Sequence, residues 1–275
     1  MPAHNFTMKS LILIATLAGL LASGCASSTA KNAMGGTATL ADLEHLAPTG
    51  TLTSASSSTD VRLQALQNTA MSLGAQAGLA WRAQQINALL AQDDKKLSTT
   101  FDFHRILLEH NVLPPVLAQG RNTLNLADNQ TIRLADRTYQ IISQARFVTA
   151  PPHWRDYLGM AYTIPERPDN TLLPRNGAEQ AIWKRCVSTS WEQGMAQANA
   201  IFADNLARLH RDYDGMVLYR SLLAQHMVSA PFVAKSALGV TGSDTDLRIN
   251  DQVLRITALP VLQKDSSQWR AGISK

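Results

Sequence analysis

The residue best placed to do chemistry in this sequence is Cys25, because of what precedes it. Lys9 stands before an apolar run at residues 11–21, and three small residues at 22–24 lead directly to the cysteine. A basic start, a short apolar segment and small residues are the three regions of a secretory signal peptide. A cysteine thiol can form a thioether with diacylglycerol. We therefore expect cleavage between Gly24 and Cys25 and lipid attachment at Cys25.

The same leader indicates where the chain goes. Its apolar run is shorter than the roughly 20 residues of a permanent transmembrane helix. Ala22 stands where leucine is commoner in a lipobox, and a plain signal peptide with an incidental cysteine is the alternative. Ala26, rather than aspartate, follows the cysteine, which favours the outer membrane of a Gram-negative cell. Palmitate and the diacylglycerol chains together would hold the protein firmly on the periplasmic side.

Residues capable of catalysis or metal binding are scattered along the rest of the sequence. Glu109 and His110 are adjacent, and neighbours on regular structure point apart, so they do not predict an acid/base pair. His104 and His110 are six residues apart, which is poor spacing for a zinc site. The phosphate-binding, nucleophile-elbow and His-Glu-x-x-His motifs do not occur. We expect no catalytic, cofactor-binding or metal residues.

Two sets of carboxylates leave alternatives open. Asp244, Asp246 and Asp251 suggest calcium, but the glycine and closing glutamate of a binding loop are missing, so a solvated hairpin turn explains them better. A cell-wall-acting enzyme such as a peptidoglycan hydrolase would need a cleft with a carboxylic acid of raised pKa. Glu166 and Glu179 are the candidates for that role, and nothing in the sequence selects them.

Composition permits a sizeable core and argues against nucleic acid as a direct ligand. Hydrophobic residues make up 45% of the chain, and the net charge of +4 is spread without a basic block. Cys186 is the only other cysteine, so acylation of Cys25 would exclude an intramolecular disulfide. Its position in a helical pattern predicts a buried, inert thiol, and a nucleophile is the alternative.

Helical periodicity predicts long helices on both sides of a strand-rich centre. Apolar residues recur at helical spacing over residues 61–90 and again over 183–209, and a third helix is expected at 216–227 after a break at 212–215. Gly74 and Gly78 lie on one face of the first helix and predict the close approach of another backbone. The apolar stripe on the second helix predicts core packing, with a partner-binding face as the alternative.

Alternation predicts antiparallel strands in the centre and near the end. Strands around residues 124–126 and 132–134 flank a turn at Asp128-Asn129, and a further run spans residues 138–142. A second strand pair is expected around a turn at Asn250-Asp251. The fold class is therefore α+β, with one globular domain of long helices packed with a small antiparallel sheet. We expect a signal peptide at 1–24, a lipidated flexible linker at 25–58 containing a short helix at 40–46, the domain at 59–265 and a tail at 266–275.

Several longer segments of this sequence resemble those of a known protein family. The runs at residues 111–117, 120–139, 154–158, 215–220, 232–242 and 249–257 resemble the DotC family, in order and over roughly residues 60–262. Members are lipoproteins of type IVB secretion systems, including the TraI proteins of IncI-type conjugative plasmids. The resemblance implies a structural role and no catalytic residues. It also implies a DotD-like lipoprotein and a DotH-like outer-membrane channel protein as partners, in a multimeric ring.

The residues and the resemblance together predict a periplasmic lipoprotein that helps to assemble a secretion or conjugation channel. Buried aromatic and arginine side chains would anchor its partners. Exposed strands in the middle region could also pair with partner strands.

Overall fold

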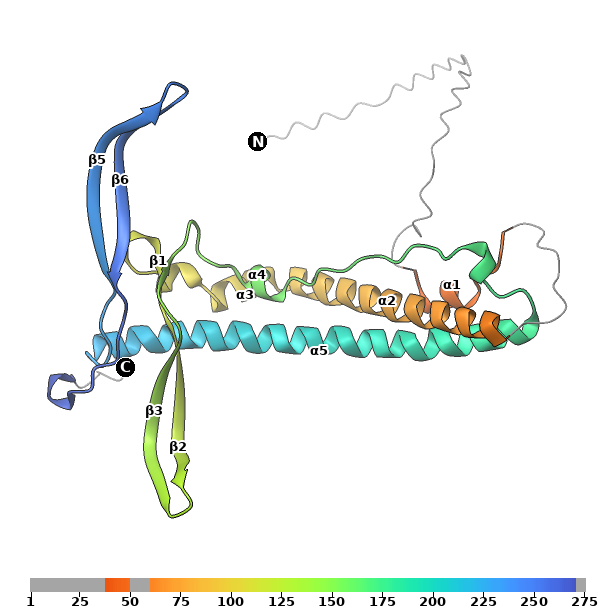
Figure 1. The fold of residues 1–275 in the computed structure, drawn as a ribbon, viewed down its shortest axis with the longest axis horizontal. Coiled ribbons are helices and arrows are strands. Elements are labelled where there is room, and N and C mark those ends of the chain that lie inside the picture. The colour runs from red at the N-terminus through yellow and green to blue at the C-terminus, as the bar shows by residue number, and fades with distance from the viewer. Residues whose placement is uncertain (1–37, 50–59, 271–275) are drawn as a thin grey trace, which may run out of the picture.

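The computed structural model describes residues 38–49 and 60–270, and Figure 1 shows their arrangement. The helices are α1 (Leu40–Glu44), α2 (Asp60–Gln92), α3 (Asp94–Thr100), α4 (Trp154–Leu158) and α5 (Gly177–Ala224). The strands are β1 (Val112–Leu113), β2 (Val116–Asp128), β3 (Thr131–Ser143), β4 (Arg146–Phe147), β5 (Phe232–Ser243) and β6 (Asp246–Ala258). The 3-10 helices η1 (Phe103–Ile106), η2 (Glu109–Asn111) and η3 (Asn170–Leu172) lie between these elements, and η4 (Ser266–Gln268) follows β6. The predicted α+β class is confirmed.

Two long helices form the body of the molecule. α2 has 33 residues and α5 has 48, which correspond to about 50 Å and about 70 Å of helix. They lie side by side and run in the same direction (Figure 1). Arg62 and Glu179 near their starts, and Arg82 and Asn199 further along, are each joined across the interface and are each 117 residues apart in sequence. The two helices therefore keep one register over several turns.

Glycines bring these helices together, as the Gly74 and Gly78 spacing predicted. A Cβ at Gly74 would lie 2.6 Å from the carbonyl oxygen of Val187, and a Cβ at Gly78 would collide with the backbone of Trp191. Gly194 on α5 makes the reciprocal approach, where a Cβ would lie 2.8 Å from the nitrogen of Leu79. The helix backbones are in contact here, so no larger side chain fits.

The core follows the α2–α5 seam and continues to its end. Trp183 and Val187 pack with Leu66 and Leu73 at one end, and Trp154 packs with Leu209 and Met216 at the other, as separate clusters of buried side chains. The main contributors are large: Trp154, Trp183, Tyr219 and Phe103 are all fully buried. Core packing, rather than a partner-binding face, is thus the role of the apolar stripe on α5.

A described segment before residue 59 packs on the helical body. α1 occupies most of the predicted short helix at 40–46, and Leu43 is fully buried in the core beside Trp183. The indole Nε1 of Trp183 donates to the carbonyl oxygen of Leu43 at 2.9 Å. Residues 38–49 therefore pack against the domain, and the rest of the predicted linker at 25–58 lies outside the described residues.

The predicted helix break at 212–215 is wrong, because α5 runs without interruption from Gly177 to Ala224. Gly215, which suggested a break, is instead a packing position. A Cβ there would lie 2.7 Å from the carbonyl oxygen of Leu117, where β2 crosses the helix. Cys186 is half-buried in α5 against the core, less enclosed than the buried thiol that was predicted.

In the described residues the strands form three separate two-stranded sheets, β1–β4, β2–β3 and β5–β6, rather than one small sheet. The central hairpin is confirmed, with its turn one residue later than predicted and with the run at 138–142 as part of β3. The predicted turn at Asn250-Asp251 is wrong. These residues lie inside β6 at an irregularity, where Asn250 has φ 59°, and the hairpin turns at 244–245.

Candidate functional site

The predicted lipid-attachment site lies outside the residues that the structure describes. Cleavage between Gly24 and Cys25 and acylation of Cys25 therefore remain predictions. In residues 38–49 and 60–270, no helix is both long enough and apolar enough to cross a membrane.

Glu179, a candidate for glycan hydrolysis, is a structural carboxylate. It is 1% exposed, and Arg62 donates to it through Nε at 3.0 Å and through Nη2 at 3.1 Å. The backbone N–H of Arg175 donates to the same carboxylate at 2.9 Å. A carboxylate held in this way has no access to a substrate.

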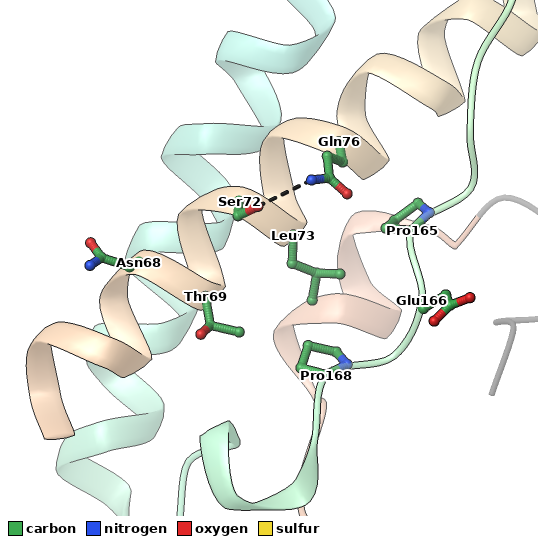
Figure 2. A pocket seen from close by; sticks show the side chains of 8 residues that line it. All are labelled: Asn68, Thr69, Ser72, Leu73, Gln76, Pro165, Glu166 and Pro168. Carbon is green, nitrogen blue, oxygen red and sulfur yellow. Dashed lines mark hydrogen bonds between the residues drawn. The ribbon is translucent and has the colours of Figure 1, made fainter.

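Glu166 is exposed beside a shallow pocket on α2 (Figure 2). The pocket has a volume of about 350 Å³ and is lined by Asn68, Thr69, Ser72, Leu73, Gln76, Pro165, Glu166 and Pro168. Figure 2 shows the Glu166 side chain directed away from α2, while Gln76 donates to the hydroxyl of Ser72 at 3.2 Å. A glycosidase uses two carboxylates facing one bond. Glu166 and Glu179 do not form such a pair.

A serine and a histidine meet in the domain without forming a nucleophile. The hydroxyl of Ser98 lies 3.3 Å from His153 Nε2, and the indole of Trp154 donates to that hydroxyl at 3.0 Å. His153 Nδ1 accepts from the backbone N–H of Arg155 at 3.2 Å. The neutral ring must then carry its proton on Nε2, so it donates to Ser98 and cannot activate it. The His153 side chain serves as the N-cap of α4.

The remaining polar candidates are also dispersed. His110 adopts φ 61° in the turn before β1, and no group of three or more potential metal ligands is found in the described residues. Asp246 at the β5–β6 hairpin pairs with Arg248 at 3.2 Å, and the Asp251 carboxylate accepts from the Thr241 hydroxyl. Asp244 lies in the hairpin turn and Asp246 follows it directly, so the turn explains these two aspartates, whereas Asp251 lies inside β6.

What the structure does display are two long hairpins. β2–β3 and β5–β6 leave the same end of α5 and project to opposite sides of the helical body (Figure 1). The base of β2 packs on α5 through Val116 and Leu117, both buried. Beyond that base, the strands of each hairpin pair only with each other in the described residues. The hairpins are therefore ribbons with solvent on both faces.

The β2–β3 hairpin presents an apolar face. Leu124 lies opposite Leu134, and Leu126 lies opposite Ile132, so all four side chains share one side of the ribbon. Their exposed fractions run from 56% to 77%. Monomeric proteins seldom expose apolar side chains as a contiguous group. This face is a candidate interaction surface.

The opposite face of the same hairpin is cationic. Arg121 lies directly across from Arg137, and Arg133 follows on the same side. All three are exposed, and within residues 38–49 and 60–270 none of their guanidinium groups makes an ion pair or hydrogen bond. Like charges directly opposite one another destabilise a strand pair. An anionic partner would remove that penalty.

The β5–β6 hairpin has a similar apolar side. Val240 lies opposite Ile249, and Leu247 lies on the same side opposite Gly242. These three apolar side chains are all exposed. The alternation of residues 124–134 allowed the first hairpin to be identified from sequence as a possible partner-pairing strand. The second was predicted as a strand pair, but β5 was not recognised as its first strand and the turn was placed at Asn250-Asp251, so its exposed apolar side was not identified.

Comparison with known proteins assigns the family. A family model described as type IV secretory system, conjugal DNA-protein transfer, matches residues 60–271. The chain belongs to this family. The match covers α2 through the last described residues, including both hairpins, and it confirms the resemblance seen in the sequence. The protein is therefore a component of a type IV secretory system for conjugal transfer.

The type IV secretory family is one of transport components rather than a known enzyme family. No curated protein matches the chain. Membership places its partners within the secretion complex, and the two hairpins are surfaces suited to such partners.

Proposed function

We propose that the protein is a periplasmic lipoprotein, anchored in the outer membrane through Cys25, that assembles the core complex of a type IVB secretion system for conjugative DNA transfer. In this role it helps to place a DotH-like channel protein at the outer membrane, together with a DotD-like lipoprotein. It acts by binding, not by catalysis.

One observation carries the proposal: a family match to conjugal transfer components coincides with a fold that exposes two apolar-faced hairpins. A body of two packed helices holds both hairpins at one end. Such a body can set the spacing between partners. The leader ending at Cys25 supports the anchor, and residues 26–37 separate the lipid from the packed chain.

The test is membrane fractionation of the full chain and of Cys25→Ser in donor cells, following this protein and the channel protein together. Cys186→Ser is the matched control, because it removes the other thiol and leaves the leader intact. We expect the Cys25→Ser variant to leave the outer-membrane fraction and the channel protein to leave with it. If the variant is lost and the channel protein stays, this protein does not place the channel.

A further inference from the structure

The two hairpins have unsatisfied edges. Each strand of the two hairpins has one edge with no strand beside it in the described residues. The backbone N–H and C=O groups along that edge are unpaired in β2, β3, β5 and β6. An isolated two-stranded hairpin is marginally stable in water, and three or more strands are usually needed. Long exposed edges are also ready templates for strand addition. Both hairpins are thus built to gain a strand.

The charges on the two hairpins are complementary. The polar face of β2–β3 carries Arg121, Arg133 and Arg137 against a single acidic residue, Asp128, beside the turn. The outer part of β5–β6 carries Asp244, Asp246 and Asp251 against a single arginine, Arg248. Each hairpin has apolar side chains on its other face. The polar face of β2–β3 is therefore basic, and the outer part of β5–β6 is acidic.

We propose that the β2–β3 hairpin of one copy of this chain pairs edge to edge with the β5–β6 hairpin of a second copy. The product is a four-stranded antiparallel or mixed sheet shared between two molecules. Its apolar residues lie on one face, because edge pairing places the faces of neighbouring strands side by side. Its other face brings the arginines of one copy next to the aspartates of the next.

The geometry favours a second copy over pairing within one molecule. The hairpins leave the same end of α5 in opposite directions, so their outer parts are far from each other in one chain (Figure 1). One neighbouring copy can present its β5–β6 hairpin to β2–β3, and another can present its β2–β3 hairpin to β5–β6. The contact is head to tail, because different surfaces of the two copies meet, and such contacts continue into a ring or a filament. This extends the proposed function but does not depend on the lipid anchor.

Disulfide cross-linking between two tagged copies of the full chain tests the pairing. One copy carries Leu126→Cys and the other Leu247→Cys, both with Cys186→Ser, co-expressed in donor cells and oxidised in intact envelopes. We expect a mixed dimer of the two tags. Val61→Cys, exposed at the far end of α2, is the control and should give no mixed dimer with Leu247→Cys. Products of 126 with 126, or adducts with a different protein alone, would overturn the proposal.

Charge reversal separates true pairing from chance collision. Arg133→Asp with Arg137→Asp should reduce the mixed dimer by about tenfold or more, because like charges then face each other. Asp244→Arg with Asp246→Arg in the other copy should restore it. Arg185→Asp, an exposed arginine on α5, is the matched control and should change nothing. Cross-linking that ignores the reversal would overturn the proposal, whereas failure of the Cys25→Ser experiment alone would leave it intact.

Discussion

Arg62 and Glu179 form a two-pronged ion pair that joins the first turns of the two long helices. The guanidinium donates to both carboxylate oxygens, at 3.0 Å and 3.1 Å, and its remaining donors reach the carbonyl oxygens of Thr171 and Leu173. The helix that begins at residue 60 and the helix that begins at residue 177 are thereby held in register with the loop before α5. This pair sets the register of the two parallel helices at their N-terminal ends.

Removing one partner of this pair should be strongly destabilising. Arg62→Ala leaves a nearly inaccessible carboxylate without its counter-charge, which costs about 3–5 kcal/mol. Urea unfolding of the purified domain measures this change. Arg82→Ala is the matched control, because Arg82 makes an exposed hydrogen bond to Asn199 and should cost far less. Equal losses for the two variants would contradict the central role of the Arg62–Glu179 pair.

The close helix approach should show in glycine substitutions. Gly78→Ala places a Cβ into the backbone of Trp191, so α5 must shift and the domain should lose stability. Gly177→Ala is the control at the start of α5, where a Cβ meets nothing within 4 Å. That control should stabilise the domain by about 0.4–1 kcal/mol, because alanine restricts the unfolded chain. Thermal unfolding compares the two, and opposite signs are expected.

Much of this architecture was readable from sequence, because it is encoded locally. The periodicity of residues 61–90 and the alternation around residues 124–134 specify a helix and a hairpin without reference to the rest of the chain. The break assigned to residues 212–215 failed for a tertiary reason. Gly215 looked like a helix terminator, but its missing side chain makes room for the backbone of Leu117.

The candidate interaction surface was harder to predict, because it consists of apolar side chains that do not pack into the core. Sequence alternation indicates an exposed face and a buried face, and apolar residues are normally assigned to the buried one. Leu124 and Leu134 are exposed although they have the pattern of core residues. The turn assigned to Asn250-Asp251 was misleading in the same region, because asparagine there accommodates a positive φ inside a strand rather than closing a hairpin.

Stability should fall at alkaline pH through a buried phenol. Burial raises the pKa of Tyr219 to about 12, above its ordinary value of 10, and its hydroxyl donates to the carbonyl oxygen of Ser229 at 3.0 Å. The folded state favours the neutral form of Tyr219. The contribution of this phenol to the free energy of unfolding is therefore complete below pH 10 and is lost as pH rises toward 12. Tyr219→Phe should lower stability at pH 7 by about 1–2 kcal/mol and flatten the loss between pH 10 and 12. Denaturant unfolding across that range measures both effects, and an unchanged slope would contradict the assignment.

The hairpin tips should matter for assembly and not for folding. Leu124→Ser with Leu134→Ser removes two exposed side chains that contribute little to the folded chain, so unfolding should shift by no more than about 0.5 kcal/mol per site. Conjugation frequency and the yield of the assembled complex should nevertheless fall, because the apolar face that partners cover is gone. Leu73→Ala is the contrasting variant, since that side chain lies in the core and its loss costs about 2–5 kcal/mol. If the hairpin variant folds normally and transfers DNA at the parental frequency, this face is not used. A fall in transfer with unchanged stability would show that the face acts in assembly and not in folding.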